Sequence, residues 1–580
     1  MKLNSYRALL SEHLKPQMRR VLLLAVLLFV DIGLQLINPQ IIRRFIDTVK
    51  SDTPLDVLMY LALLFIGVSV VQQGISVCSA YVGENVSWTA TNSLRRSLAR
   101  HCLNLDVSFH NSHTPGEMIE RIDGDVNALG NFFSQFAIQL LGNFLLMLGI
   151  LVLLFFEDWR AGVGLTVFVG LALLITFRLR TIAVPHMKAT REESANMFGF
   201  LEERLSGAED IRASRAQFFV LRQFYERTRN WLKKELKSAF MINILVITSS
   251  MLWAIGNATA LGIGAYLFYQ EAFSLGAVYM IVHYTNMLLA PINHIMFQLE
   301  DLQKAGASVE RVSELGQMQS KLGPGRGDAL GEGRLSVRFD RVTFGYAEEE
   351  PVLKDVDFTL GAGRVLGLLG RSGSGKTTLT RLLFRLYDPW QGAVALGDTD
   401  VRHAHQADVC HRIAMVTQNV QLFQGSVRDN LTLFDDAISD AQIYNAIEAL
   451  ALEDWFATFS DGLKTGLTSD GGGLSAGEAQ LLAFARVFLL KDPDVVVLDE
   501  ASSRLDPATE HYLEQAVDRL IQDRTAIVIA HRLDTVARAD DIMILDTGRI
   551  VEYGERSKLE QDETSKFSKL MRAGMEDMLA

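Results

Sequence analysis

Several features are scarce in this chain of 580 residues, and each absence excludes a class of protein. Only three cysteines occur, and none stands at the spacing of metal ligands: Cys78, Cys102 and Cys410. A disulfide framework or a structural zinc site is therefore not expected, and a reducing cytosolic side fits this usage. The formal net charge is −12. A nucleic-acid partner is not expected either, because phosphate neutralisation needs clustered Lys and Arg.

The chain also lacks the layout of a signal peptide, because its first residues, MKLNSYRALLSEHLK, are largely polar and no small-residue cleavage site follows promptly. Hydrophobic residues, in contrast, make up 49% of the sequence, against 21% charged residues. They are concentrated before position 300. This distribution predicts a membrane half followed by a soluble half, with about three to four domain-sized units in total.

Six apolar stretches precede Asp301, each close to the roughly 20 residues that a helix needs to cross a bilayer. They are Val21–Ile42, Leu55–Ser76, Phe132–Phe156, Ala161–Phe177, Ile242–Tyr266 and Leu275–Ile295. The connections after the first, third and fifth stretches are short and contain acidic residues. Those after the second and fourth are long and basic. The positive-inside rule therefore places both termini and the long connections in the cytoplasm.

The two long connections are predicted to be helical extensions rather than loops. No Gly or Pro interrupts Glu84–Thr114 or Ala208–Ile255, so each is expected to continue as helix. A helix from Leu55 to Leu105 would run about 75 Å, against a hydrocarbon core of about 30 Å. We expect stalks that reverse at two turns, Ser108–Glu117 and Ser206–Asp210, and that carry rigid-body motion to a soluble domain.

The predicted fold is an α-helical membrane domain of six transmembrane helices with long cytoplasmic extensions, fused to an α/β P-loop ATPase domain. The predicted boundaries are residues 1–316 for the membrane domain, 317–333 for a Gly-rich polar linker and 334–580 for the nucleotide-binding domain.

The sequence GRSGSGKTT fits a phosphate-binding loop, with an apolar strand before it and helical spacing after it. Its glycines let successive N–H groups point at phosphate oxygens, at a helix N-terminus that favours anions. Lys376 is expected to reach the β- and γ-phosphates, and the Thr377 hydroxyl to ligate Mg²⁺. The residues predicted to hold the nucleotide here are Gly370, Arg371, Ser372, Gly373, Ser374, Gly375, Lys376, Thr377 and Thr378.

Three further segments have polar residues at the end of a predicted strand or at the start of a predicted helix. A β-branched run ends in Asp499, which suits a Mg²⁺ shell, and Glu500, which suits polarising an attacking water. A second apolar strand ends in His531, which could reach the γ-phosphate. The glycine cluster before Ser475 starts another phosphate-facing helix. The N-termini of two such helices in one compact domain cannot easily contact the same nucleotide. They can do so if the nucleotide is sandwiched between two domains, each of which contributes one helix.

With these motifs, the chain from about Arg19 onward resembles an ATP-binding cassette exporter half-transporter, similar to multidrug and lipid exporters of the type I fold. GRSGSGKTT looks like the family's Walker A motif, VVVLDE like Walker B and LSAGE like the signature. SFHNSHTPGEMIERIDGDV and LEERLSGAEDIRASRA are similar to its two coupling regions.

The resemblance implies ATP and Mg²⁺ as cofactors and assigns roles to individual residues. The implied catalytic residues are Glu500, His531, as the switch histidine, and Gln418, as the Q-loop glutamine. The implied Mg²⁺ ligands are Thr377, Gln418 and Asp499. Further implied nucleotide contacts are Tyr346, stacked on adenine, Ser475 and Gly477 of the signature, and Asp506 of the D-loop.

The sequence departs from the family pattern at the signature and the D-loop. Ala476 stands where glycine is usual, Glu478 where glutamine is usual, and Arg504 where alanine is common. The stretch before the signature, TSDGGG, lacks the glutamate that the family has there, and Asp470 is its only acidic residue. Because a signature completes the nucleotide site of the partner chain, these changes would affect that composite site. A homodimer and a heterodimer both stay open.

We expect ATP-driven export of a hydrophobic or amphipathic small molecule, lipid or peptide by alternating access, as a dimer in a bacterial-type plasma membrane. Asp31, Gln35 and Asn38 lie at helical spacing in the first span. Their acidic group, with Met280, Met287 and Met296 nearby, would suit a bulky amphipathic or cationic cargo. Hydrogen bonding between helices would also explain these residues. Two other functions stay open: import of a siderophore-like cargo on the same fold, and an ATP-gated regulatory or channel-like assembly.

Overall fold

The structure is a computed structural model that describes residues 15–49, 54–135, 140–323, 325–417, 420–468, 474–490, 493–499, 507–530 and 536–573. The chain divides into two compact units. The first, here the membrane unit, comprises Met1–Asn104 and His113–Met318. The second, the soluble unit, comprises Leu105–Ser112 and Gln319–Ala580.

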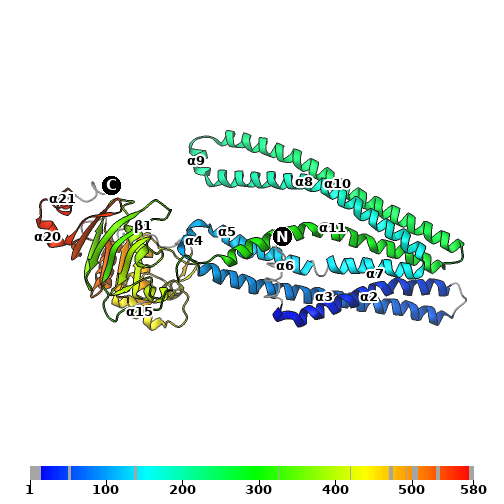
Figure 1. Cartoon of the computed structure of the whole chain (residues 1–580), viewed down its shortest axis with the longest axis horizontal. Helices are drawn as coiled ribbons and strands as arrows, with labels where there is room; N and C mark the ends of the chain where they lie inside the picture. Colours follow the sequence, from blue (N-terminus) through cyan, green and yellow to red (C-terminus); the bar gives the residue numbers. More distant parts are fainter. Residues whose placement is uncertain are drawn as a thin grey trace. The chain divides into compact units, whose positions relative to one another are not determined.

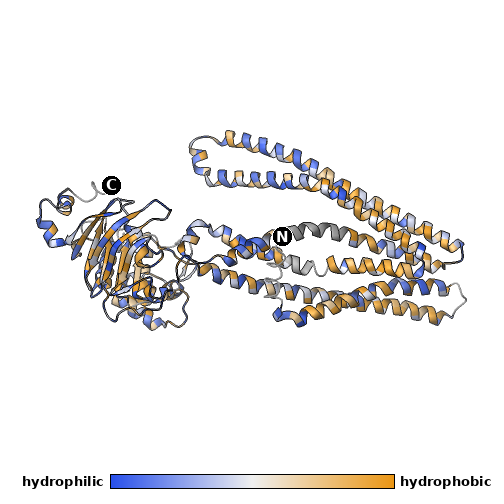
Figure 2. Ribbon diagram, in the orientation of Figure 1, coloured by the Kyte–Doolittle hydropathy of each residue, from blue (hydrophilic) through white to orange (hydrophobic). Residues whose placement is uncertain are grey.

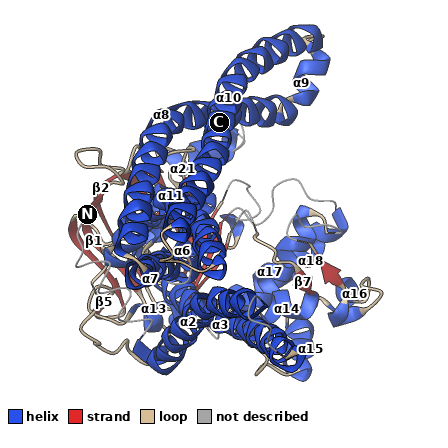
Figure 3. Cartoon of the chain, turned by 90° about the vertical axis from the view of Figure 1, so that its right-hand side faces the viewer, coloured by secondary structure: helices blue, strands red, loops and turns tan. Residues whose placement is uncertain are grey.

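The membrane unit consists of long helices arranged in antiparallel pairs. α2 packs against α3, and α8 against α10 with the short α9 joining them (Figures 1 and 3). The elements are η1 (Lys15–Gln17), α2 (Met18–Val49), α3 (Leu55–Leu103), α5 (Pro115–Ile119), η2 (Glu120–Gly124), α6 (Asp125–Gln135), α7 (Gly142–Glu157), α8 (Trp159–Ser206), α9 (Ala208–Ala213), α10 (Gln217–Tyr269) and α11 (Leu275–Gln317).

Several of these helices are much longer than a bilayer is thick. α3 has 49 residues and α10 has 53, so at 1.5 Å per residue they run about 70 to 80 Å. Figure 2 shows mainly hydrophobic residues along α2, α7, the first half of α3 and the halves of α8 and α10 that lie away from α9. Polar residues prevail in the halves of α8 and α10 next to α9. The predicted helical extensions are therefore confirmed.

Five described helices are long and apolar enough to cross a membrane. They are Lys15–Val49, Leu55–Leu103, Trp159–Ser206, Gln217–Tyr269 and Leu275–Ile292. The remaining predicted span, Phe132–Phe156, falls on α6 and on α7, an apolar helix of 16 residues. Residues 136–139, within this span, lie outside the described residues. A membrane domain of helices is thus confirmed.

Small residues allow close packing where α10 meets its neighbours. A Cβ on Gly256 would lie 2.7 Å from the ring of Phe168, and one on Gly264 would lie 2.9 Å from Val278. In a bilayer, where helices gain no hydrophobic burial from association, such close approach supplies the packing energy. Glycine at these positions therefore stabilises the contacts of α10 with α8 and α11.

The soluble unit is built around a six-stranded sheet with the order β12-β11-β3-β10-β9-β6. All pairings are parallel except that of β11 with β12. The strands are β3 (Val365–Leu369), β6 (Ile413–Val416), β9 (Val495–Asp499), β10 (Thr525–Ile529), β11 (Asp541–Asp546) and β12 (Arg549–Glu555).

A second, antiparallel sheet has the order β2-β1-β4-β5, and β7 pairs with β8. Their bounds are β1 (Val337–Phe344), β2 (Leu353–Leu360), β4 (Gln391–Leu396), β5 (Thr399–Asp400), β7 (Gly425–Ser426) and β8 (Gly466–Leu467). The helices of this unit are α4 (Val107–Ser112), α12 (Lys376–Leu383), α13 (Gln406–Arg412), α14 (Val427–Thr432), α15 (Asp440–Ala449), α16 (Glu453–Phe456), α17 (Ala476–Leu490), α18 (Pro507–Ile521), α20 (Arg556–Gln561) and α21 (Lys566–Ala573), with η4 (Gly462–Lys464).

Both faces of the central sheet are covered, which explains its continuous apolar strands. Along β3, Val365 and Leu369 belong to the hydrophobic cluster that includes α17, α18 and the helices before them. Leu366 and Leu368 belong to the cluster formed with the antiparallel sheet and α12. Every residue of β3 is therefore buried, and the strand is a rigid base for the loop that follows it. The α/β fold class is confirmed.

Candidate functional site

The loop between β3 and α12 is shaped by glycines in conformations that other residues adopt only with strain. Gly370, Gly373 and Gly375 have φ values of 152°, 78° and 109°. A Cβ on Gly370 would collide with the carbonyl oxygen of Leu545, and one on Gly375 would lie 2.7 Å from a methyl group of Leu353. The main chain is therefore packed closely against its surroundings, and it turns sharply into α12.

Lys376, the first residue of α12, is buried at 7% exposure. Its ammonium donates to the carbonyl oxygens of Gly370 at 2.5 Å and Arg371 at 3.1 Å. A buried ammonium needs such acceptors, because burying a charge without hydrogen-bond partners costs free energy. The lysine is thus held inside the loop by the loop itself.

The loop also contains an unused polar atom. The Ser374 hydroxyl is buried and has no hydrogen-bond partner among the described residues. Arg371, Ser372, Gly373 and Thr377 are exposed around it. The unpaired Ser374 hydroxyl, the Lys376 ammonium and the N-terminal turn of α12 lie together in this loop. All three favour an anion, so the loop fits a polyphosphate.

Tyr346 is tied to this loop through the first turns of α12. It is 48% exposed. Its hydroxyl lies 3.2 Å from Thr378 Oγ1 and accepts a hydrogen bond from Arg381 at 3.1 Å. The guanidinium of Arg381 also lies 5.7 Å from the ring centroid. These contacts fix an exposed aromatic ring relative to the phosphate loop, as stacking on a base would require.

Asp499 lies at the same edge of the sheet as the loop. It ends β9, and the strand register aligns it with Ile529 of β10, which in turn aligns with Leu368 of β3. Parallel strands bring their carboxyl ends together, where ligands bind in such sheets. Four other predicted site residues lie outside the described residues: Gln418, Glu500, Asp506 and His531. Their roles therefore stay predictions.

The predicted signature forms a reciprocal cap at the start of α17. The Ser475 N–H donates to the Glu478 carboxylate at 2.7 Å, and the Glu478 N–H donates to the Ser475 hydroxyl at 3.2 Å. Gly477 is buried in the same turn. This is a capping box. A glutamine could accept the same bond without a charge, so what Glu478 adds to the helix N-terminus is its charge.

No group of three or more His, Cys, Asp or Glu side chains that could hold a metal ion occurs in the described part of the chain. Mg²⁺ needs no such group, because it usually binds through one or two protein ligands and completes its shell with phosphates and water. Thr377 and Asp499 are donors of the oxygen type that Mg²⁺ prefers.

The segment Leu105–Ser112, which follows α3 in sequence, packs within the soluble unit. Asn111 donates to the Tyr387 hydroxyl at 2.8 Å. Asp106 accepts the N–H of Lys321 at 2.5 Å and bonds from Ser108 and Phe109. Burial raises the pKa of Asp106, but these hydrogen bonds outweigh it, so the pKa lies below its ordinary value. The segment is thus anchored by an ionised carboxylate.

Tyr387 was not identified by the sequence analysis. Its ring packs edge-on against Tyr346, with centroids 5.3 Å apart, while its hydroxyl receives the Asn111 bond. One side chain therefore connects the segment that follows α3 to the aromatic ring beside the phosphate loop. No sequence motif marks it, because its role depends on residues 276 positions apart coming together.

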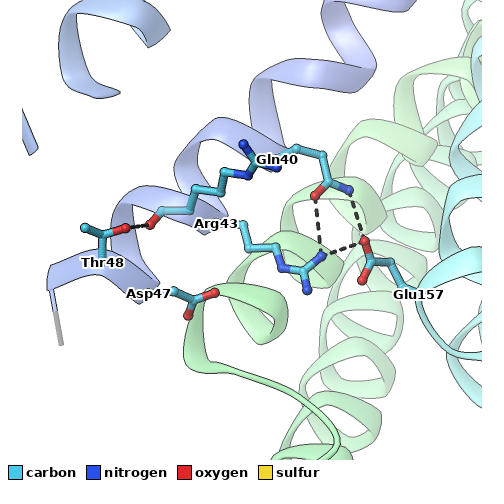
Figure 4. A pocket seen from close by; sticks show the side chains of 6 residues that line it. Gln40, Arg43, Asp47, Thr48 and Glu157 are labelled. Atoms are coloured by element: carbon cyan, nitrogen blue, oxygen red, sulfur yellow. Dashed lines mark hydrogen bonds and ion pairs between the residues drawn. The ribbon is translucent and has the colours of Figure 1, made fainter. Parts of the chain in front are cut away.

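The membrane unit has its own polar pocket, with a volume of about 600 Å³ (Figure 4). It is lined by Gln40, Arg43, Arg44, Asp47, Thr48 and Glu157. Arg43 pairs with Glu157 at 2.6 Å, and this pair connects α2 to the end of α7. Asp47 accepts the Ser274 hydroxyl at 2.6 Å and the Gly276 N–H at 2.9 Å at the start of α11. These contacts hold three helix ends together at the predicted extracytoplasmic side.

The first prediction concerns Lys376. Lys376→Ala should insert into the membrane normally but lose about 10- to 100-fold in nucleotide affinity, because a charge-assisted contact to phosphate is worth about 1.5–3 kcal/mol. Equilibrium binding of a fluorescent ATP analogue measures this. Lys464→Ala, an exposed lysine of the same unit, is the control. Parental affinity in Lys376→Ala would mean that the loop is only structural.

The second prediction concerns Tyr387. Tyr387→Phe keeps the ring against Tyr346 but removes the acceptor of Asn111. It should keep nucleotide affinity and basal ATPase, and it should lower transport about 2- to 10-fold, as expected for one hydrogen bond of about 1 kcal/mol. Tyr553→Phe, which removes a hydroxyl that donates to the carbonyl oxygen of Thr359, is the matched control. Equal transport by the two variants would contradict the coupling role of Tyr387.

Comparison with known proteins identifies both units. Residues 21–292 match the family model for the ABC transporter transmembrane region, and residues 353–503 match the model for the ABC transporter. Together the two matches cover well over half of the chain.

Relatives match along most of the sequence. An ATP-dependent lipid A-core flippase of Alcanivorax borkumensis is 29% identical over 82% of this chain and 82% of its own length. A probable multidrug resistance ABC transporter ATP-binding/permease protein of Bacillus subtilis is 29% identical over 80% of this chain and 69% of its own.

A solved structure of a bacterial Atm1-family ABC exporter with ATP bound has the same fold. Its TM-score is 0.79, at 23% identity, and the match covers 96% of this chain and 98% of that one. The chain is therefore a multi-pass membrane protein of the ABC transporter family, a half-transporter of the exporter type whose ATPase activity is coupled to transport.

Proposed function

We propose that two half-transporters, of which this chain is one, move a hydrophobic or amphipathic molecule out of the cell by alternating access in a bacterial-type plasma membrane. The observation that carries this proposal is the combination of the buried Lys376 and the orphaned Ser374 hydroxyl with membrane helices that extend far beyond a bilayer. The names of the relatives, a lipid flippase and a multidrug transporter, support export over import.

In the proposed mechanism, Lys376, Ser374 and the loop N–H groups hold the phosphates of ATP, and Tyr346 stacks on its base. Thr377, Gln418 and Asp499 would hold Mg²⁺, which neutralises charge on the β- and γ-phosphate oxygens. Glu500 orients the attacking water and accepts its proton as the bond between the γ-phosphorus and the bridging oxygen breaks. His531 contacts the γ-phosphate and stabilises its charge.

The second phosphate-facing helix, α17, requires a partner. Ser475 and Gly477 cannot serve the same nucleotide as this chain's own loop if each ATP lies between two chains, so they complete the site of the partner. There the Ser475 backbone N–H already donates to the Glu478 carboxylate, and the Ser475 hydroxyl oxygen accepts from the Glu478 N–H. Phosphate oxygens must share or replace this carboxylate. With a non-identical partner this would weaken one of the two composite sites, and in a homodimer it would weaken both equally.

Closure around ATP would move the soluble units and, through the segment after α3, the membrane helices. At the predicted outer side, α2 would have to separate from α7 and α11 for cargo to leave. The Arg43–Glu157 pair and the contacts of Asp47 would then be the bonds that open. ATP favours the closed state because it binds that state better.

The third prediction tests the chemical step. Glu500→Gln keeps the shape of the side chain but loses its basicity, so ATP turnover should fall by about 10²- to 10⁴-fold. ATP binding should survive, since it depends on Tyr346 and Lys376. Turnover and the nucleotide retained after rapid desalting are measured with Mg²⁺ present. Glu453→Gln, on an exposed part of α16, is the control. Near-parental turnover in Glu500→Gln would show that another group is the base.

The proposed transport is tested by vectorial uptake into proteoliposomes whose nucleotide-binding domains face outward. A panel of lipids, hydrophobic dyes and peptides is offered with ATP, and ATPase stimulation is measured in parallel. We expect ATP-dependent accumulation of at least one amphipathic compound, and none with Lys376→Ala. An ATPase that no compound stimulates, without accumulation, would instead favour an ATP-gated regulatory role.

A further inference from the structure

A carboxylate lies near the middle of the first membrane-crossing helix. Asp31 is well inside α2 (Met18–Val49), about 20 Å along the helix from its start and about 27 Å from its end at 1.5 Å per residue. A charged group at this depth is costly, and it normally faces the interior of the bundle or a water-filled cavity. Asp31 therefore needs a physical explanation.

The structure supplies this carboxylate with neutral donors. One oxygen accepts the amide of Gln35 at 2.8 Å, one turn along α2, and the other accepts the amide of Gln72 at 2.9 Å from α3. Each carboxylate oxygen can accept a further bond. The three side chains are only partly buried, so a ligand can reach them.

A cation is missing from this arrangement. Among the described side chains of the membrane unit, which leave out those of residues 1–14, 50–53, 131–139 and 293–304, none forms an ion pair with Asp31. The nearest basic residues of α2, Arg20 and Arg43, are about 16 and 18 Å away along the helix, and they contact Asn85 and Glu157. On α3, Lys and Arg are absent from Leu55 to Leu94.

Hydrogen bonding between α2 and α3 does not require this charge. Asn38 donates to Ser69 at 3.3 Å across the same pair of helices, and this neutral contact is sufficient to join helices in a membrane. An asparagine at position 31 could also accept the amide bonds, without the desolvation cost of a carboxylate. The negative charge itself must therefore have a use.

We propose that Asp31, with Gln35 and Gln72, binds the cationic group of the transported molecule. This rests on the proposed export function and adds a substrate class: hydrophobic monovalent organic cations. The carboxylate neutralises the positive group, and the two amides hold the carboxylate in place. Leu28 and Leu34, about one turn from Asp31 on α2, and Val68 and Ile75, about one turn from Gln72 on α3, are only partly buried. They suit the apolar body of such a molecule.

Two probes of similar shape separate charge recognition from hydrophobic binding. Tetraphenylphosphonium carries a permanent charge, and triphenylphosphine oxide is neutral. Binding of each to the purified full-length protein is measured by equilibrium dialysis, together with its effect on ATPase activity. The variants are Asp31→Asn, which removes the charge, Asp31→Glu, which keeps it, and Asn38→Ala, which weakens the same α2–α3 contact without changing charge.

We expect Asp31→Asn to bind tetraphenylphosphonium at least tenfold more weakly and to bind the oxide as the parent does. Asp31→Glu should stay within a few-fold of the parent, and Asn38→Ala should not discriminate between the probes. Equal loss of both probes in Asp31→Asn, or no loss, would overturn the proposal. A parent protein that hydrolyses ATP but binds no tetraphenylphosphonium would overturn the cation site alone. One without ATPase activity would overturn the proposed function itself.

Discussion

The constraint on which the nucleotide site depends is the placement of the buried Lys376 ammonium, which in this structure donates to the carbonyl oxygens of Gly370 and Arg371. It holds a cation inside a turn that glycines alone can form, at the end of a strand buried on both faces. The charge is therefore placed by the most rigid part of the soluble unit. Tyr346, through Thr378 and Arg381 of α12, is positioned relative to the same turn.

A series of side-chain contacts connects this loop to the segment that follows α3. Tyr346 contacts Tyr387, and Tyr387 accepts a bond from Asn111. Asn111 belongs to a segment that follows α3 directly in the chain. In the proposed mechanism, a change at the nucleotide would shift the end of α3 through these three side chains. The long helices would then carry the displacement, because an uninterrupted helix resists bending.

Features with local causes were predictable from sequence. The phosphate loop, the apolar strands and the overlong helices follow from glycine spacing, burial on two faces and the absence of helix breakers. The contact of Tyr387 with Asn111 and the assignment of Leu105–Ser112 to the soluble unit depend on long-range packing, so no pattern indicated them. The stretch after Ala208 was expected to continue as one helix, yet α9 ends at Ala213 and Arg215 adopts a positive φ of 53° before α10. No Gly or Pro marks this break.

The most direct test is a structure of the protein with Mg²⁺ and ATP, at a resolution that shows side chains. The account predicts that the Lys376 ammonium leaves the carbonyl oxygens of Gly370 and Arg371 and contacts the β- and γ-phosphates. The Ser374 hydroxyl should then have a phosphate partner, and Tyr346 should lie against adenine. A nucleotide bound elsewhere, with Lys376 still held by the two carbonyls, would contradict the account.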